Sequence, residues 1–261
     1  MTVASTTEDD AATARLRALY LDTVERIVCN TVYRDPSVDA GGVEYPYDAD
    51  TRAVGRDWPS RALTMIGTQR LHHLRGCVEQ VLADGVPGDL LEAGVWRGGA
   101  SILMRAILAA YGARERRVWL ADSFRGLPPP SPQRYPLDAD LRLNDIPVLA
   151  VPRETVQHNF EALGLLDDSV RFVEGWFADT LASVDADAFA VVRLDGDLYE
   201  STMQSLDALY PKLSPGGFLI VDDYGCLGAC RAAVHDYRER HGIREPIEAI
   251  DWTGAYWRKA R

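Results

Sequence analysis

The sequence predicts an α/β protein with a mainly parallel sheet that is covered by helices on both faces. Short apolar runs alternate with helix-like segments after residue 88, and such alternation is typical of βαβ crossovers. The runs expected to form buried strands are Asp89–Val95, Val118–Phe124, Val170–Phe177, Phe189–Leu194 and Phe218–Val221. The helix-like segments are Ala100–Tyr111, Glu154–Leu163, Ser201–Leu213 and Cys226–His241. Two short runs around Thr253-Gly254 predict a terminal hairpin.

Two helices are expected before this alternation begins. Apolar side chains recur at steps of three and four over residues 13–32 and again over Thr68–Ala83, as on amphipathic helices. Between them, Arg34–Pro59 is rich in Gly, Pro, Asp and Tyr, and we expect a loop there. We therefore predict an N-terminal helical extension with a loop over residues 1–87 and an α/β domain over residues 88–261.

A proline-rich insertion interrupts the α/β alternation. Residues 125–153 hold seven of the chain's 14 prolines, at positions 128, 129, 130, 132, 136, 147 and 152. Because proline disfavours regular helix and sheet, we expect a long ordered loop or lid. Long loops that follow parallel strands commonly carry function, although a surface excursion without function fits the same composition.

Composition narrows the partners and the compartment. The formal net charge of −11 argues against nucleic acid or an anionic membrane as the main partner. No apolar run has the roughly 18–20 residues of a membrane span, and the acidic N-terminus differs from a secretory signal. The four cysteines are scattered, as in a reducing compartment. We expect a cytoplasmic protein.

The first candidate site is a glycine-rich turn for a nucleoside-like ligand. "DLLEAGVWRGGAS" (Asp89–Ser101) predicts a strand, a turn and a helix start, and its glycines allow backbone to approach a ligand closely. Glu92 precedes Gly94 by two residues and would repel a pyrophosphate, so the spacing favours another ligand. Asp122 follows the next strand and is suited to accept ribose hydroxyls. Gly94 alone equally fits an ordinary turn.

The second candidate site is a group of acids that follow two predicted strands. Asp195 and Asp197 belong to "RLDGDLY" (Arg193–Tyr199), and Asp222 and Asp223 follow a later strand. If these strands are neighbours, Asp195 and the Asp222–Asp223 pair converge at one edge of the sheet. Three carboxylates suit a hard cation such as Mg²⁺. Asp197 also fits a helix cap or a turn, and Asp223 alone fits a solvated loop acid.

Several separate motifs resemble one known family, in the same order and over residues 15–258. They are "TMIG" (Thr64–Gly67), "LEAGVWRGGAS" (Leu91–Ser101), "ADSF" (Ala121–Phe124), "EGWFADT" (Glu174–Thr180), "RLDGDLYEST" (Arg193–Thr202) and "SPGGFLIVDDY" (Ser214–Tyr224). The chain resembles the macrocin O-methyltransferase family, whose members are S-adenosylmethionine- and magnesium-dependent and methylate sugar hydroxyls on antibiotic natural products. The resemblance implies a Rossmann-like methyltransferase fold over residues 88–261, with a seven-stranded sheet and a C-terminal antiparallel hairpin.

The resemblance also implies a set of site residues by position. Asp122 and Ser123 would hold the ribose, Trp176 and Phe177 would lie near the adenine, and Thr64 and Met65 would close over the cofactor. The full set implied for the cofactor is Thr64, Met65, Glu92, Gly94, Val95, Arg97, Gly98, Gly99, Ala100, Ser101, Asp122, Ser123, Phe124, Gly175, Trp176 and Phe177. The set expected for Mg²⁺ is Asp195, Asp222 and Asp223.

The expected chemistry combines the two sites. The methyl group of S-adenosylmethionine is already activated, and Mg²⁺ would stabilise the alkoxide that develops on a sugar hydroxyl. We assign Asp195 as both metal ligand and base, because neither lysine, Lys212 or Lys259, lies near the motifs. The substrate is expected to be a small glycosylated natural product, and the apolar N-terminal helices favour a homo-oligomer.

Three other functions stay open on the sequence alone. A phenolic hydroxyl of an aromatic polyketide is an alternative acceptor. The "DGD" segment also fits the metal-binding DxD of a glycosyltransferase, and a non-catalytic adenosyl-binding module would keep the glycine turn. The sequence leaves the sugar, its hydroxyl and the aglycone undetermined.

Overall fold

A seven-stranded sheet forms the centre of the protein. A computed structural model describes residues 3–261 of the chain. The sheet has the order β6-β5-β4-β7-β8-β10-β9. Its parallel strands are β4 (Asp89–Ala93), β5 (Val118–Asp122), β6 (Val170–Glu174), β7 (Phe189–Leu194) and β8 (Leu213–Val221). The strands β9 (Glu248–Ala249) and β10 (Ala255–Arg258) add the predicted antiparallel hairpin. The predicted sheet is confirmed; the first two residues of the predicted extension lie outside the described residues.

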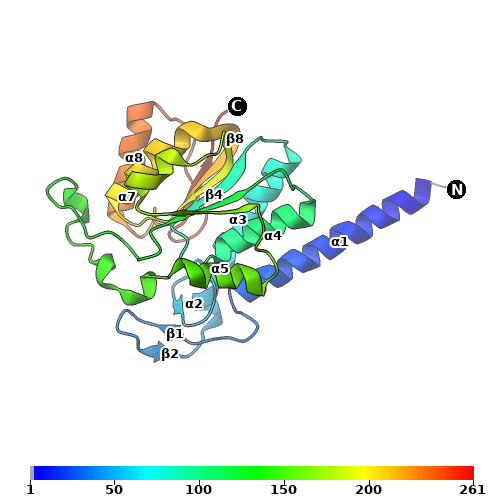
Figure 1. Cartoon of the computed structure of the whole chain (residues 1–261), viewed down its shortest axis with the longest axis horizontal. Helices are drawn as coiled ribbons and strands as arrows, with labels where there is room; N and C mark the ends of the chain where they lie inside the picture. The colour runs from blue at the N-terminus through cyan, green and yellow to red at the C-terminus, as the bar shows by residue number, and fades with distance from the viewer. Residues whose placement is uncertain (1–2) are drawn as a thin grey trace.

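Helices cover both faces of this sheet (Figure 1). Successive side chains of β4 show the division, because Leu90 packs into one buried core and Leu91 into the other. The first core is formed with α1 (Val3–Val28), α3 (Gly67–Ala83), α4 (Gly99–Tyr111) and α5 (Arg153–Ala162). The second is formed with α7 (Tyr199–Leu209) and α8 (Gly228–His241). The α/β architecture with two covered faces follows directly.

Only the C-terminal part of α1 packs against the rest of the protein. Leu21, Val24 and Val28 are buried in the first core, whereas the N-terminal half of the helix projects away from the rest of the chain (Figure 1). Leu16 and Leu19 remain 66% and 62% exposed. Among the described helices, none combines the length and the hydropathy that a bilayer crossing requires.

The segment expected to be a loop contains a small sheet, so the loop prediction is wrong there. Strands β1 (Ser37–Val38), β2 (Glu44–Tyr45) and β3 (Trp58–Pro59) pair antiparallel, and α2 (Ala49–Ala53) lies between β2 and β3. Two-residue strands are too short to show an alternating pattern. Their positions depend on a buried arginine instead: Arg52 donates to Asp35 (2.9 Å), to the Cys29 carbonyl (2.9 Å) and to Asp57 (2.8 Å).

The proline-rich insertion is ordered and anchored to the α/β body. It contains the 3₁₀ turns η1 (Pro136–Asp138), η2 (Leu143–Asp145) and η3 (Pro147–Leu149). The carboxylate of Asp138, which is fully buried, accepts from the backbone N–H groups of Tyr199 (2.7 Å) and Glu200 (3.0 Å) at the start of α7. Trp96 donates from its indole to the Val148 carbonyl (2.8 Å). The insertion therefore packs over the ends of the strands, where the two candidate sites lie.

Candidate active site

A cavity of about 930 Å³ opens at the carboxyl ends of the parallel strands. This is where the order β5-β4-β7 reverses the direction of the crossovers, the usual ligand position in an open α/β sheet. The N-terminal extension, the insertion and the terminal hairpin all contribute to its wall. The predicted site residues that line it are Met65, Gly94, Val95, Asp122, Ser123, Gly175, Trp176, Phe177, Asp195, Asp222 and Asp223.

The turn after β4 requires glycine for steric reasons. Gly94 has φ +90°, and a Cβ there would overlap the Asp195 carbonyl and lie 3.2 Å from the Asp195 Cβ. Gly99 faces the other way, because its N–H donates to the Leu63 carbonyl (2.8 Å) and a Cβ would meet that carbonyl. The turn therefore lies against two walls, with Gly94 at the cavity and Gly99 at the N-terminal extension.

Some predicted cofactor residues support this turn from outside the cavity. Arg97 donates to the Pro59 and Ala62 carbonyls (3.0 and 2.9 Å), and Thr64 is buried. In the described part of the chain, the predicted residues outside the set that lines the cavity are Thr64, Glu92, Arg97, Gly98, Gly99, Ala100, Ser101 and Phe124.

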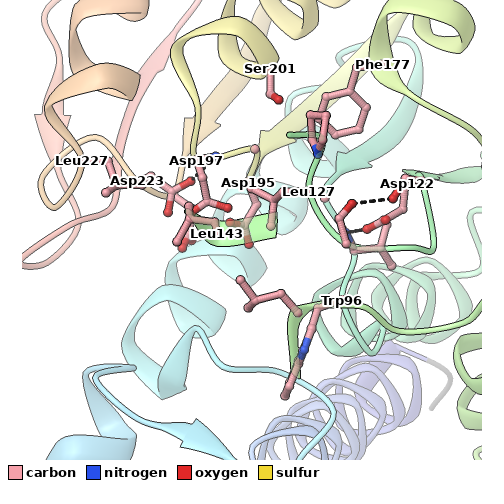
Figure 2. A pocket seen from close by; sticks show the side chains of 18 of the residues that line it. Trp96, Asp122, Leu127, Leu143, Phe177, Asp195, Asp197, Ser201, Asp223 and Leu227 are labelled. Atoms are coloured by element: carbon pink, nitrogen blue, oxygen red, sulfur yellow. Dashed lines mark hydrogen bonds between the residues drawn. The ribbon is translucent and has the colours of Figure 1, made fainter. Parts of the chain in front are cut away.

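Asp122 forms one end of the cavity (Figure 2). Its carboxylate accepts from the backbone N–H groups of Val95 (2.7 Å) and Phe124 (2.8 Å). Burial raises the pKa of this carboxyl, although these hydrogen bonds oppose the shift. Each oxygen keeps a further acceptor lone pair, so the group can take two hydroxyl donors such as those of a ribose.

Aromatic side chains complete this end of the cavity. Trp176 and Phe177, which the resemblance implied, both line it. Trp96 lines it as well and was missed by the sequence reasoning. Its backbone is left-handed, with φ +48°, which holds the turn while the indole is fixed on the insertion. An aromatic residue inside a glycine-rich turn was the signal that could have identified it.

Three carboxylates gather at the opposite end of the cavity (Figure 2). One ligand oxygen from each of Asp195, Asp197 and Asp223 lies within 4.8 Å of the others. Asp197 has φ +58°, and its N–H donates to Asp223 (3.1 Å). The alternative that Asp197 caps α7 is wrong, because Asp138 of the insertion accepts from the first N–H groups of that helix. We call Asp195, Asp197 and Asp223 the acid cluster.

Asp222, the other predicted metal ligand, is paired with two arginines. Its carboxylate accepts from Arg193 (2.5 Å) and from Arg70 of α3. Sequence reasoning missed both arginines. Arg193 carried a usable signal, because a charged residue within a buried strand is unusual unless it is paired. Arg70 carried none, since only the packing of α3 brings it to the cavity.

The acid cluster holds more negative charge than its surroundings neutralise. Burial, and then the neighbouring carboxylates, raise the pKa of Asp197 to about 8 and that of Asp223 well above its ordinary value. Burial raises the pKa of Asp195 to about 6, although Arg193 opposes the shift. Carboxylates in this arrangement disfavour being ionised together, and a bound cation relieves that repulsion.

Glu92 and Arg193 form a buried pair beneath the cavity. Arg193 is only 2% exposed and donates to Glu92 (2.7 Å) and Asp195 (2.9 Å), while the Ser101 hydroxyl donates to Glu92. Burial raises the pKa of Glu92 to about 7 even though Arg193 lowers it. Glu92 therefore acts on the cavity through Arg193 in the described structure.

The chain matches the macrocin-O-methyltransferase (TylF) family over residues 21–259. It belongs to this family. It is 56% identical over 243 residues to the 8-demethyl-8-(2,3-dimethoxy-alpha-L-rhamnosyl)-tetracenomycin-C 4'-O-methyltransferase of Streptomyces olivaceus, covering 93% of each chain. It is 51% identical to the mycinamicin III 3''-O-methyltransferase of Micromonospora griseorubida, covering 93% of this chain and 96% of that one. The structure of the O-methyltransferase NovP has a TM-score of 0.90 at 48% identity, covering 94% of this chain and all of the other.

Family membership confirms the predicted enzyme class and the predicted fold. The protein is an O-methyltransferase with the Rossmann-like fold of such enzymes. In this macrocin-O-methyltransferase family member, one cavity has two chemically different ends. One end carries aromatic rings and Asp122, and the other carries the acid cluster.

Proposed function

We propose that the protein transfers a methyl group from S-adenosylmethionine to a hydroxyl of a deoxysugar on a glycosylated natural product, with Mg²⁺ bound by carboxylates. The observation that carries this proposal is the single cavity that joins a nucleoside-type end at Asp122 to the acid cluster. The Streptomyces olivaceus relative is named for a substrate with a rhamnosyl group, which supports a sugar acceptor.

The chain's own groups fit S-adenosylmethionine at the Asp122 end. Gly94 leaves room where a Cβ would collide, Asp122 accepts hydroxyl donors, and Trp176, Phe177 and Met65 offer apolar contact. S-adenosylmethionine supplies, when bound, a methyl group on a positively charged sulfur. The predicted residues that lie outside the cavity wall act by shaping the turn, with Arg97 fixing it to the N-terminal extension.

The chain's own groups also fit Mg²⁺ at the other end. Carboxylate oxygens are its preferred protein ligands, and one oxygen from each acid of the cluster lies within 4.8 Å of the others. Burial and the neighbouring carboxylates raise the pKa of Asp197 and Asp223, and a bound cation would relieve the repulsion between them. When bound, Mg²⁺ supplies Lewis acidity that makes a coordinated hydroxyl easier to deprotonate. Asp195 stays our proposed ligand and base, and its side chain is 25% exposed to the cavity side of the network. Asp222 stays a proposed ligand that would have to share its carboxylate with Arg70 and Arg193, and Asp197 joins the ligand set by position.

Neither lysine competes with Asp195 for the role of base among the residues that the structure describes. Lys212 donates to the Val184 carbonyl (2.7 Å), and Lys259 donates to the carbonyls of Leu213 (2.7 Å) and Tyr210 (3.1 Å). Both ammonium groups therefore lie near the amino ends of β7 and β8, whereas the acid cluster lies at the carboxyl ends of these strands.

The remaining wall of the cavity suits a large apolar acceptor. Leu127, Leu143 and Leu149 come from the insertion, and Trp58 and Trp252 come from the extension and the hairpin. An aglycone can contact this wall while a sugar hydroxyl lies at the acid cluster. A phenolic hydroxyl of an aromatic polyketide is the second candidate acceptor, since the same apolar wall would hold a polycyclic ring.

Methyl transfer to matched acceptors tests the proposal. The protein is incubated with S-adenosylmethionine and Mg²⁺ and with either a rhamnosylated polycyclic phenol or its sugar-free aglycone. We expect mass spectrometry to find one added methyl group on the sugar, with turnover lost in EDTA and restored by Mg²⁺. Methylation of the free aglycone at an equal rate would support the phenolic acceptor instead, and turnover that persists in EDTA would contradict the metal site.

We further propose that the protein is a cytoplasmic homo-oligomer that associates through α1. Leu16 and Leu19 leave an apolar stripe exposed on the projecting helix, which supports association through α1. The four cysteines of the chain are free thiols, which supports a reducing compartment. A Leu16→Glu/Leu19→Glu variant is expected to shift the molar mass in light scattering to that of a monomer. The division into an extension over residues 1–87 and a methyltransferase domain over 88–261 stays a proposal of the same kind, supported by the separate small sheet before α3.

A further inference from the structure

One buried guanidinium lies between the two ends of the cavity. Arg193 of β7 stands directly opposite Glu92 of β4 in the parallel ladder, and both side chains are 2% exposed. The strand β4 leads into the glycine turn, and β7 leads into Asp195 and Asp197. The Glu92–Arg193 pair is therefore placed where the cofactor end and the acid end share a wall.

The guanidinium contacts one acid within β4 and two acids that directly follow β7 and β8. One terminal nitrogen donates to Glu92 (2.7 Å), and the other donates to Asp195 (2.9 Å) and Asp222 (2.5 Å). These charge-assisted bonds hold the planar fork of Arg193 in one orientation. A buried charge that loses its partner is strongly unfavourable. If Glu92 moves, we therefore expect the guanidinium of Arg193 to change its contacts with Asp195 and Asp222 as well.

A second contact ties the same two strand ends together. The backbone N–H of Asp195 donates to the Ala93 carbonyl (2.8 Å), and Gly94 packs so closely on the Asp195 carbonyl that no Cβ fits between them. A ligand that fixes the turn at Gly94 therefore fixes the backbone of Asp195. Backbone and side chain of the proposed metal ligand are both held from β4.

We propose that Arg193 is a positioning residue that couples S-adenosylmethionine binding to divalent-cation binding, an inference that rests on the proposed function. A cofactor on the Gly94 turn steadies the end of β4, Glu92 steadies the guanidinium, and the guanidinium orients Asp195 for the cation. Because linkage is reciprocal, the cation raises the affinity for the cofactor by the same factor.

Binding measurements without any acceptor test this coupling. The affinity for Mn²⁺ alone is measured by electron paramagnetic resonance with and without S-adenosylhomocysteine. In the wild-type chain we expect S-adenosylhomocysteine to tighten Mn²⁺ binding by about fivefold or more. In Glu92→Gln, which keeps the shape of the side chain and removes its charge, we expect the two affinities to become independent.

A matched variant separates the network from a general loss of charge. Asp122→Asn removes one negative charge from another buried acid, at the cofactor end, whose hydrogen bonds go to backbone groups of Val95 and Phe124. It is expected to weaken S-adenosylhomocysteine binding and to leave the affinity for Mn²⁺ alone unchanged. Glu92→Gln is expected to lower the affinity for Mn²⁺ alone, because Arg193 then pairs only with Asp195 and Asp222.

The possible outcomes distinguish the inference from the proposed function. Coupling that survives Glu92→Gln, or wild-type binding of Mn²⁺ that S-adenosylhomocysteine does not change, overturns the inference alone. A wild-type chain that binds no Mn²⁺ overturns the proposed metal site and the inference with it. If Glu92→Gln does not fold, Arg193→Lys replaces it, since an ammonium keeps the charge but has a single nitrogen in place of the two that separately contact Glu92 and the Asp195–Asp222 pair. Retained coupling there also counts against the inference.

Discussion

The two ends of the cavity treat buried negative charge in opposite ways. At one end, Asp122 is compensated by two backbone N–H groups that the glycine turn and the following residues supply. At the other end, Asp195, Asp197 and Asp223 lie within 4.8 Å of one another. Arg193 donates to Asp195, whereas the Asp223 carboxylate accepts from the backbone N–H of Asp197 (3.1 Å).

The two ends therefore differ in how far the described groups around each carboxylate offset its negative charge. At the Asp122 end, backbone hydrogen bonds oppose the pKa rise that burial causes, and we propose that the ligand there is selected by shape, hydroxyl donors and aromatic contact. In the acid cluster, neighbouring carboxylates add to the effect of burial and raise the pKa of Asp197 and Asp223 further, so we propose that its ligand is selected by positive charge. The predictions below begin with the two ends and the backbone contact that joins them, and finish with a residue outside the cavity wall.

Asp195→Asn has the largest expected effect on activity. Loss of the proposed ligand and base should lower kcat/KM by about a thousandfold, equal to about 4 kcal/mol, because no other described group occupies that position. Measured without divalent cation, S-adenosylhomocysteine binding at the other end should stay within about twofold of the wild-type value. Asp187→Asn, an exposed acid just before β7, is the control and should keep full activity. Activity near the wild-type value in Asp195→Asn would remove this residue from the mechanism.

Gly94→Ala should damage both ends together. The added Cβ overlaps the Asp195 carbonyl in a left-handed turn, so we expect the free energy of unfolding to fall by about 3 kcal/mol or more. The comparison is Gly112→Ala, which has φ +68° and no neighbouring atom within 4 Å of the new Cβ. That change should cost only the backbone strain of about 1 kcal/mol. Equal losses in urea unfolding of the two variants would show that the contact with Asp195 is not what requires glycine.

Asp138→Ala should loosen the insertion over the cavity. The start of α7 loses its two acceptor bonds, which is expected to lower the free energy of unfolding by about 1–2 kcal/mol. The KM for the acceptor should rise more than the dissociation constant for S-adenosylhomocysteine. Asp140→Ala removes an exposed acid from the same segment and serves as the matched control. An unchanged KM in Asp138→Ala would show that the insertion does not contact the acceptor.

His73 gives the smallest effect and lies outside the set of residues that line the cavity. Burial lowers the pKa of this side chain, which lies against Tyr256, from 6.5 to about 4. The unfolded chain therefore binds a proton that the folded chain excludes, so stability contributed by neutral His73 is complete above pH 6.5 and is lost as the pH falls towards 4. Urea unfolding of His73→Asn should show a smaller loss of stability between about pH 7 and about pH 5.

The neighbouring His72 provides the control for this titration. Its side chain is 79% exposed, so His72→Asn should keep the pH dependence of the wild-type chain. Two variants with the same pH dependence would mean that other groups account for the acid sensitivity.

Local pattern was enough to predict most of the fold. The apolar runs identified β4 to β8, since buried parallel strands are apolar on both faces, and helical periodicity identified α1 and α3. The small sheet before α3 escaped, because its two-residue strands depend on contacts of Arg52 with Asp35 and Asp57 rather than on a pattern. The family and the enzyme class were also predictable, since several motifs recur in order.

The sequence by itself determined which groups lie at the ends of the parallel strands. Strand direction places Gly94, Asp122, Asp195 and Asp223 at one edge of the sheet, because backbone register leaves no other position for residues that follow these strands. Tertiary structure decided which acid pairs with which arginine or backbone N–H group. Arg70 and Arg193 donate to Asp222. Asp138 accepts from the first N–H groups of α7, so Asp197 does not cap that helix and lies in the acid cluster instead. Such pairings depend on side chains that meet across distant segments, and local spacing contains no record of those distances.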